Sequence, residues 1–199
     1  MAAVVEVEGV SKTFGSGELA VQALKPCSFV VQQGELAALI GPSGSGKSTL
    51  LLSISLILEP TAGRIVINGQ EVYNNGWTGV DERAFRRRNI GFIFQQHNLI
   101  PFLTAQENVA LMMQLNGASR RDAARRAREP PLILADEPTA ALDTDRGSKV
   151  MALLKKIARE RRSAVIAVTH DHRMIEGFDT VYRLEDGVLA RMPQTAVHG

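Results

Sequence analysis

A glycine-rich stretch near residue 45 carries the residues of this chain that are best suited to chemistry. The phosphate-binding pattern G-x-x-x-x-G-K-[ST] is matched at every fixed position by Gly41-Pro42-Ser43-Gly44-Ser45-Gly46-Lys47-Ser48-Thr49. Its glycines lack a Cβ, so the backbone can wrap closely around a phosphate and point several N–H groups at it. Lys47 can reach phosphate oxygens with its charge, and the Ser48 hydroxyl can ligate Mg²⁺. The candidate binding residues of this stretch are Gly41, Ser43, Gly44, Gly46, Lys47, Ser48 and Thr49.

The residues on either side of this stretch support the same interpretation. Residues 36–40 are all apolar and predict a buried strand, and residues 50–58 predict a buried helix. The N-terminus of such a helix adds partial positive charge at the point where a phosphate would lie. An ordinary strand-to-helix loop is the alternative, and the strand–turn–helix context favours the phosphate site.

A second candidate group follows the apolar residues 132–135, which predict another buried strand. Asp136 comes directly after it, at the strand end where a phosphate-loop protein holds Mg²⁺. Glu137 is next in the chain and is a candidate base for an attacking water. The alternative is that the pair only caps a helix and faces solvent.

The elements around these groups predict an α/β fold. Apolar stretches alternate with helical ones, as in a largely parallel sheet covered on both faces. The first part predicts antiparallel strands at 4–10, 20–24, 28–31, 64–67 and 71–73, a turn-rich loop at 11–17 and a hairpin turn at Asn68-Gly69. The later part predicts helices at 81–88, 104–115, 120–128 and 144–161, strands at 90–94 and 163–168, and a hairpin of 181–184 and 188–190 around Asp186-Gly187.

Composition excludes several classes of protein. The 199 residues are 45% hydrophobic and 22% charged, as expected of a globular domain, and the net charge of +2 does not call for a nucleic-acid partner. The single cysteine, Cys27, excludes a disulfide framework and predicts a small core residue in a reducing compartment. No apolar run reaches the ~20 residues of a membrane span, and the first nine residues are not a signal peptide. Arginine clusters at 86–88, 120–128 and 159–162 fit either solvated helix faces or contact with anionic lipid headgroups.

Taken in order, these motifs resemble the nucleotide-binding subunits of ATP-binding-cassette (ABC) transporters over nearly the whole chain. Residues 41–49 match the Walker A loop, and residues 132–137 match the Walker B strand with its catalytic glutamate. Gln95 follows Gly91-Phe92-Ile93-Phe94 at the Q-loop position, Asp143 closes the D-loop Ala141-Leu142-Asp143, and His170 falls at the switch histidine. Phe14 falls at the aromatic position that stacks on adenine. Residues 91–101 and 131–139 most resemble the lipoprotein-release and macrolide-export branch, which includes heterocyst glycolipid exporters.

The resemblance implies a role for each matched residue. Glu137, His170 and Gln95 would be catalytic, with Gln95 contacting Mg²⁺ or the water and His170 bonding the γ-phosphate. Ser48, Gln95 and Asp136 would hold Mg²⁺, while Phe14 and Asp143 would contact ATP. His170 could instead be a plain polar residue at a strand end, and Phe14 a minor core contact.

The resemblance also implies an architecture and a cellular role. We expect one ABC ATPase domain over residues 1–199, with a nucleotide-binding core of 1–94 and 132–199, an N-terminal antiparallel β subdomain and a shortened helical subdomain at 95–131. The expected function is MgATP binding and hydrolysis coupled to export by a separate integral-membrane subunit. We expect a homodimer on the cytoplasmic face of the inner or plasma membrane, with no nucleic-acid partner.

One family motif is missing from the sequence. The signature Leu-Ser-Gly-Gly-Gln is absent between Gln95 and Asp136. The sequence around Arg128-Glu129-Pro130 is best explained by the in-frame loss of the segment that carries this signature. In the family this loop contacts the γ-phosphate held by the other subunit. The loss of one such donor costs about 10²–10³ in rate, so hydrolysis is expected to be impaired. An ATP-binding subunit that does not hydrolyse is therefore the alternative function.

Two other classes fit the sequence less well. A DNA-associated ABC ATPase needs long coiled coils or zinc modules between its motifs, and the short spacing and single cysteine argue against both. A phosphate-loop kinase or GTPase would lack the pair Gln95 and His170.

Overall fold

The computed structural model describes residues 2–94, 130–170, 175 and 177–193. The chain divides into two compact units, residues 1–95 with 130–199 and residues 96–129, and every described residue belongs to the first unit. Gln95 and the helices expected at 104–115 and 120–128 lie outside the described residues. The expected domain boundaries at 94/95 and 131/132 stay a prediction.

The first sheet is antiparallel and has the strand order β2-β1-β4-β5, which confirms the expected N-terminal β subdomain. Its strands are β1 (Ala3–Phe14), β2 (Val21–Gln32), β4 (Ala62–Ile67) and β5 (Gln70–Asn74), with a short 3-10 turn at Gly17–Leu19. The turn Asn68-Gly69 between β4 and β5 has φ of 50° and 74°, as a two-residue hairpin requires.

Two predictions about this sheet are wrong. The expected loop at 11–17 is strand as far as Phe14, and the two short strands expected at 20–24 and 28–31 are one continuous strand, β2. Pro26 lies between the two expected strands and has no N–H to give to a ladder. In the structure it falls where the β1–β2 register shifts between Val10 and Lys12, and this irregularity accommodates the proline.

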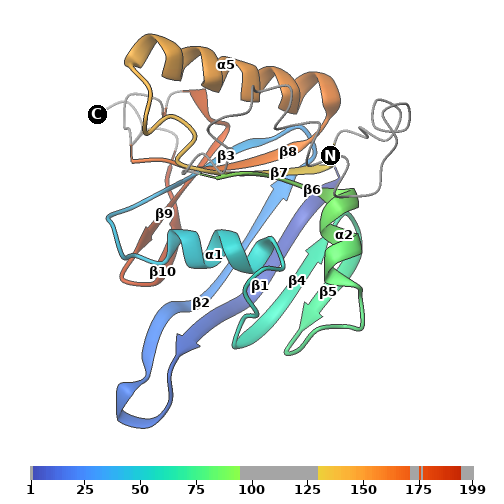
Figure 1. The fold of residues 1–199 in the computed structure, drawn as a ribbon, viewed down its shortest axis with the longest axis vertical. Coiled ribbons are helices and arrows are strands. Elements are labelled where there is room, and N and C mark those ends of the chain that lie inside the picture. Colours follow the sequence, from blue (N-terminus) through green and yellow to red (C-terminus); the bar gives the residue numbers. More distant parts are fainter. Residues whose placement is uncertain (1, 95–129, 171–174, 176, 194–199) are drawn as a thin grey trace, which may run out of the picture. The chain divides into compact units, whose positions relative to one another are not determined.

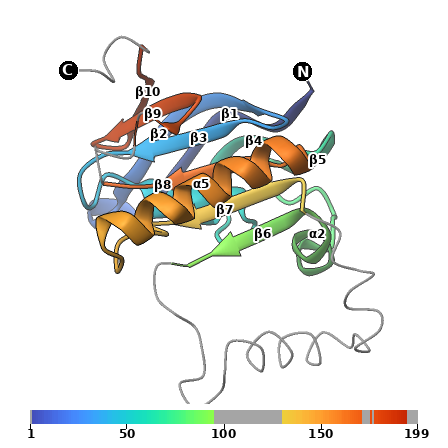
Figure 2. The ribbon, with the colours of Figure 1, turned by 90° about the horizontal axis from the view of Figure 1, so that it is seen from above.

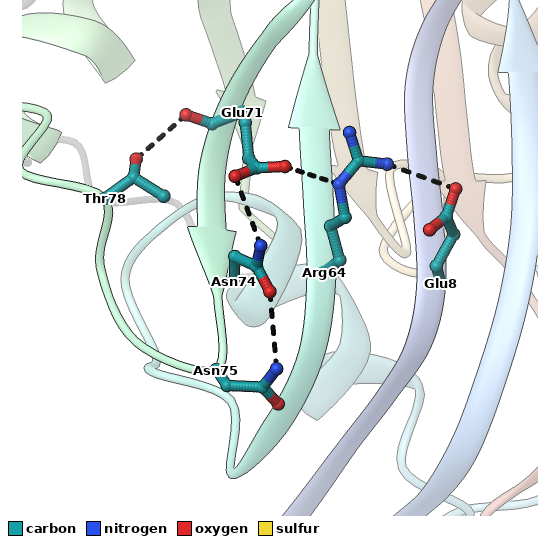
Figure 3. Close-up of polar contacts among 6 residues, drawn as sticks. All are labelled: Glu8, Arg64, Glu71, Asn74, Asn75 and Thr78. Carbon is teal, nitrogen blue, oxygen red and sulfur yellow. Dashed lines mark hydrogen bonds and ion pairs between the residues drawn. The ribbon is translucent and has the colours of Figure 1, made fainter.

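A polar network on this sheet ties three of its strands together (Figure 3). Arg64 on β4 donates from Nε to Glu71 of β5 and from Nη1 to Glu8 of β1, the latter over 3.2 Å. Asn74 and Thr78 add hydrogen bonds to the Glu71 carboxylate and carbonyl. The hydrogen bond from Arg64 is the main cause that lowers the pKa of Glu71 below 4.5.

The second sheet has the order β10-β9-β3-β8-β7-β6 and is parallel except for its outermost strand β10. Its strands are β3 (Leu36–Ile40), β6 (Ile90–Ile93), β7 (Leu132–Asp136), β8 (Ala164–Val168), β9 (Thr180–Glu185) and β10 (Val188–Arg191). All five residues of β3 and of β8 are buried. This confirms the mostly parallel sheet predicted from the apolar runs.

Helices cover both faces of the parallel sheet, with α5 on one side and α1 on the other (Figure 1). The helices are α1 (Lys47–Ile54), α2 (Glu82–Asn89) and α5 (Thr144–Arg161). Alternation along β3 explains the two layers, because Leu36 packs with the core under α5 while Ala37 and Leu39 pack with the core that contains α1. None of the helices in the described part of the chain is long and apolar enough to cross a membrane.

Helix α1 is shorter than predicted. It ends at Ile54 rather than continuing to residue 58, and Leu56 adopts a left-handed φ of 59°. The N–H groups of Ile57 and Leu58 both donate to the carbonyl of Leu52, so the turn after the helix closes back on it. Leu56 is only 3% exposed. The apolar side chain of Leu56 therefore reflects burial in the core and not a continuation of the helix.

Candidate functional site

The carboxyl ends of β3, β8 and β7 lie side by side and bring together the phosphate loop, Asp136, Glu137 and His170 (Figure 2). Leu39 of β3 is paired with Val168 of β8, and Val168 is paired with Asp136 at the end of β7. The phosphate loop, Glu137 and His170 follow these strand ends directly. Ligands of open α/β sheets bind at this edge.

The loop leading into α1 offers an uncapped helix N-terminus. Gly46 is the N-cap residue with φ 104°, no side chain caps the helix, and its first turn has no acidic residue. Ser43, Gly44 and Ser48 are exposed and Thr49 is half-buried, so a ligand has access to the loop. An anion would find backbone N–H groups and a favourable dipole here.

Lys47 is the buried cation of the loop and is 8% exposed. Its Nζ donates to the carbonyl oxygens of Gly41 and Pro42 at 2.8 and 2.7 Å. Burial lowers the pKa of Lys47 below 10.5, and the carboxylates of Glu137 and Asp136 act in the opposite direction. The ammonium group is thus fixed at the loop with both acids near it.

Ser48 and Asp136 form the pair that fits Mg²⁺. The Ser48 hydroxyl donates to Oδ2 of Asp136 over 3.3 Å, although the two residues are 88 positions apart. Burial raises the pKa of Asp136 above 3.8, and the bond from Ser48 partly opposes this rise. Hydroxyl and carboxylate oxygens are ligands that Mg²⁺ accepts, and it usually completes its shell with water and substrate phosphates. The described residues contain no group of three or more His, Cys, Asp or Glu that could hold a metal ion.

Glu137 and His170 form the second pair at this edge. His170 Nδ1 lies 3.3 Å from Glu137 Oε1, and the side chains are 63% and 20% exposed. The N–H of Glu137 donates to the Val168 carbonyl over 3.0 Å, and Glu137 has a left-handed φ of 49°. Backbone strain of this kind gathers at functional sites. A carboxylate beside an imidazole is suited to accept a proton from water.

Strands β9 and β2 pack against the glycines of the loop, a contact that was not predicted from the sequence. A Cβ added at Gly41 would lie 1.9 Å from the Leu184 carbonyl oxygen, and one added at Gly46 would lie 2.4 Å from the Ala23 carbonyl oxygen. Both contacts are with backbone that cannot give way easily. The two glycines are therefore required by packing as well as by the ligand. The pattern at 41–46 signals the glycines but not the strands that they touch.

Two predicted site residues, Phe14 and Asp143, lie apart from these contacts, and a third is outside the described residues. Phe14 ends β1, pairs with Val21 and is 43% exposed, with Lys12 Nζ 5.2 Å from its ring centroid. Asp143 is the N-cap of α5 and accepts from the Arg146 N–H over 2.8 Å. Gln95 lies outside the described residues, one position after Phe94. Their roles toward ATP stay predictions.

Residues 24–129 match the model of a protein family described as ABC transporter. This match begins in β2 and includes the whole phosphate loop. It ends at residue 129, where the sequence analysis places the break, so Asp136, Glu137 and His170 lie beyond it.

Relatives along nearly the full chain carry names from the same family. LolD of Shewanella frigidimarina, a lipoprotein-releasing system ATP-binding protein, is 33% identical over 99% of this chain and 96% of its own. HrtA of Staphylococcus haemolyticus, which is named for hemin import, is 33% identical over 92% of this chain and 97% of its own. Among solved structures, the ATP-binding cassette MJ0796 of Methanocaldococcus jannaschii, a dimer bound to ADP and phosphate, is 34% identical with a TM-score of 0.80, covering 95% of this chain and 99% of that one.

Proposed function

Because this chain belongs to the ABC transporter family, whose ATP-binding subunits hydrolyse ATP, we propose that its residues 41–49 bind MgATP and that Glu137 starts its hydrolysis. The observation that carries the proposal is the arrangement at the edge of the parallel sheet. Lys47, the pair Ser48–Asp136 and the pair Glu137–His170 lie at the sheet edge where the uncapped helix α1 begins. Together they supply charge, metal ligands and a base.

Each residue then has a chemical task. Glu137 takes a proton from the attacking water, whose oxygen bonds to the γ-phosphorus while the bond to the leaving β-phosphate oxygen breaks. Lys47 and the N–H groups of the loop hold the charge that develops on the phosphate oxygens. His170 holds the Glu137 carboxylate and can donate to the γ-phosphate. Ser48, Asp136 and Gln95 would hold Mg²⁺, which offsets the negative charge of the phosphates.

The cellular role is proposed on the names of the relatives. LolD is named for lipoprotein release, and MJ0796 is described as a dimer. By analogy, this chain would form a homodimer on the cytoplasmic face of the membrane and drive export through a separate membrane subunit. HrtA is named for hemin import, so the direction of transport is the part of the proposal on which the relatives differ.

A second candidate function is ATP binding without effective hydrolysis. The sequence has no Leu-Ser-Gly-Gly-Gln segment, and the family match stops at residue 129. The alignment with LolD extends over 232 positions, more than the 199 residues of this chain, so that relative has residues without a counterpart here. These observations support the loss of a segment that would complete the site of a partner subunit.

ATP binding and turnover by the purified chain separate the two candidates. Binding is measured by calorimetry with MgATP, and turnover by phosphate release, with Lys47→Ala and Glu137→Gln as comparison variants. Binding that requires Lys47, with turnover that requires Glu137, supports the ATPase. Binding without turnover supports the second candidate, and the absence of Lys47-dependent binding contradicts both.

A further inference from the structure

The turn between β9 and β10 contacts both the phosphate loop and strand β2. The N–H of Gly187 donates to the Ser45 carbonyl over 3.2 Å, and the N–H of Lys25 donates to the Gly187 carbonyl over 2.9 Å. Figure 2 shows β10 beside β2. A single residue of the turn therefore links the phosphate loop of one sheet with the edge strand of the other.

Packing around this link is close. A Cβ added at Gly187 would lie 3.2 Å from the Lys25 nitrogen and 3.4 Å from the Ala23 carbonyl oxygen. The same Ala23 oxygen is the atom that a Cβ at Gly46 would meet. Ser45 is 4% exposed, and its Oγ has no hydrogen-bond partner in the described part of the chain, so backbone bonds hold this residue. A shift of the turn would therefore change its contacts with both the loop and β2.

Strand β2 also pairs with Phe14, the residue that is expected to stack on the adenine of the nucleotide. Ala23 is two residues from Val21, and Val21 pairs with Phe14. At 3.3 Å per residue, the Phe14 pair lies about 7 Å along β2 from the contact with Gly46. The phosphate loop follows β3 of the parallel sheet, whereas Phe14 belongs to the antiparallel sheet. Gly187 contacts both the loop and β2, and so connects the two parts of the expected nucleotide site.

We propose that Gly187 is a positioning residue that sets the spacing between the phosphate loop and the Phe14 end of β2. The proposal rests on the proposed function for the phosphates at residues 41–49, and on the sequence-based prediction that adenine stacks on Phe14. A side chain at position 187 pushes β2 away from the loop, so the base and the phosphates no longer fit their contacts at the same time. A ligand made of phosphates alone does not depend on this spacing.

The chain contains a matched control for Gly187→Ala. Gly69 occupies the same place in the Asn68-Gly69 turn, with φ 74° against 76° for Gly187, and a Cβ there would have nothing within 4 Å. Both alanines carry the same left-handed strain, and only the one at 187 meets β2. Dissociation constants for MgATP and for magnesium tripolyphosphate are measured on the full chain for both variants, after unfolding curves confirm that they fold.

The expected result is a loss of ATP affinity of about tenfold in Gly187→Ala relative to Gly69→Ala, with tripolyphosphate affinity changed by less than about twofold. An equal loss for both ligands, or no loss, overturns the proposal. Wild-type chain that binds neither ligand contradicts the proposed function instead.

Amide hydrogen exchange on the wild-type chain tests the same proposal if Gly187→Ala does not fold. Amide hydrogen exchange at Gly187 and Lys25 is expected to slow when ATP bridges the two sides, and to stay unchanged with tripolyphosphate. Exchange rates that respond equally to both ligands overturn the proposal.

Discussion

Nδ1 of His170 lies 3.3 Å from Oε1 of Glu137, although the two residues are far apart in the chain. Glu137 directly follows β7, and His170 comes two positions after the end of β8. The parallel pairing of β7 with β8 therefore brings them together. The carboxylate is mostly buried while the imidazole is mostly exposed, so a substrate can reach the histidine without exposing the acid to bulk water.

Glu137→Gln is expected to lower ATP turnover by about 10²–10⁴-fold, because an amide cannot accept a proton from water. ATP affinity is expected to change little, since Lys47 and the loop N–H groups remain in place. Phosphate release and equilibrium binding on the same preparation test this. Turnover equal to that of the wild type would show that another group is the base.

Gly41→Ala is expected to abolish nucleotide binding, because its Cβ would lie 1.9 Å from the Leu184 carbonyl oxygen. Gly44→Ala is the control within the same loop. Its φ is also positive, at 79°, but nothing lies within 4 Å of the added Cβ. The control is expected to keep its fold at a cost of about 1 kcal/mol in unfolding free energy. Calorimetric binding of Gly41→Ala and thermal unfolding of both variants are the measurements, and equal unfolding of the two variants would contradict the prediction.

Asp136→Asn is expected to gain stability relative to the wild type as the pH rises. Burial raises the pKa of Asp136 above 3.8, so the folded chain binds this proton more tightly than the unfolded chain. Ionisation of Asp136 therefore costs stability progressively above pH 3.8. The Tm of the variant minus that of the wild type should be more positive at about pH 7 than at about pH 4. A difference that does not depend on pH would show that Asp136 is not destabilised by its burial.

Glu71→Gln should show the opposite pH dependence. The hydrogen bond from Arg64 lowers the pKa of Glu71 below 4.5, so its stabilising effect is present above pH 4.5 and is lost as the pH falls through the folded-state pKa. The variant should be less stable than the wild type near neutral pH, and the deficit should shrink on acidification. The effect is expected to be small because both side chains are partly exposed. Thermal unfolding with and without about 1 M salt checks the electrostatic origin.

The thiol of Cys27 is expected to react slowly with thiol reagents in the folded chain. Its side chain is buried, and burial raises its pKa to about 12, so little thiolate exists near pH 8. Reaction with a chromogenic disulfide should be fast in denaturant and slow without it. Equal rates in the two conditions would place Cys27 outside the core.

Local sequence signals predicted the elements whose geometry is set by their own residues. Asn68-Gly69 and Asp186-Gly187 were identified as hairpin turns because both positions need positive φ, which all four residues adopt. Helix α5 runs over Thr144–Arg161 as predicted, since Asp143 caps its start. The residues of the phosphate loop were identified by their spacing and by the strand and helix expected on either side.

Long-range packing decided the features that were missed. Strand β1 continues to Phe14 because β2 pairs with it throughout, although Ser, Thr and Gly suggested a loop. Leu56 turns back at the end of α1 because its side chain is buried there, against the usual preference of leucine. The contacts of the loop with Ala23 and Leu184 join residues from three separate stretches, and no local pattern marks them.

The strand order around β3 also has a consequence for biosynthesis. Residues 36–40 pair with β8 at 164–168 and β9 at 180–185, both of which leave the ribosome long after them. Until then, the fully apolar strand β3 has no partner strands, and its backbone hydrogen-bonding groups can pair with other chains. Parallel pairing over such separations is slow, because loop closure must precede the contacts that reward it. The nascent chain should therefore depend on chaperones for most of its synthesis, because β3 gains its neighbours β8 and β9 only near the end.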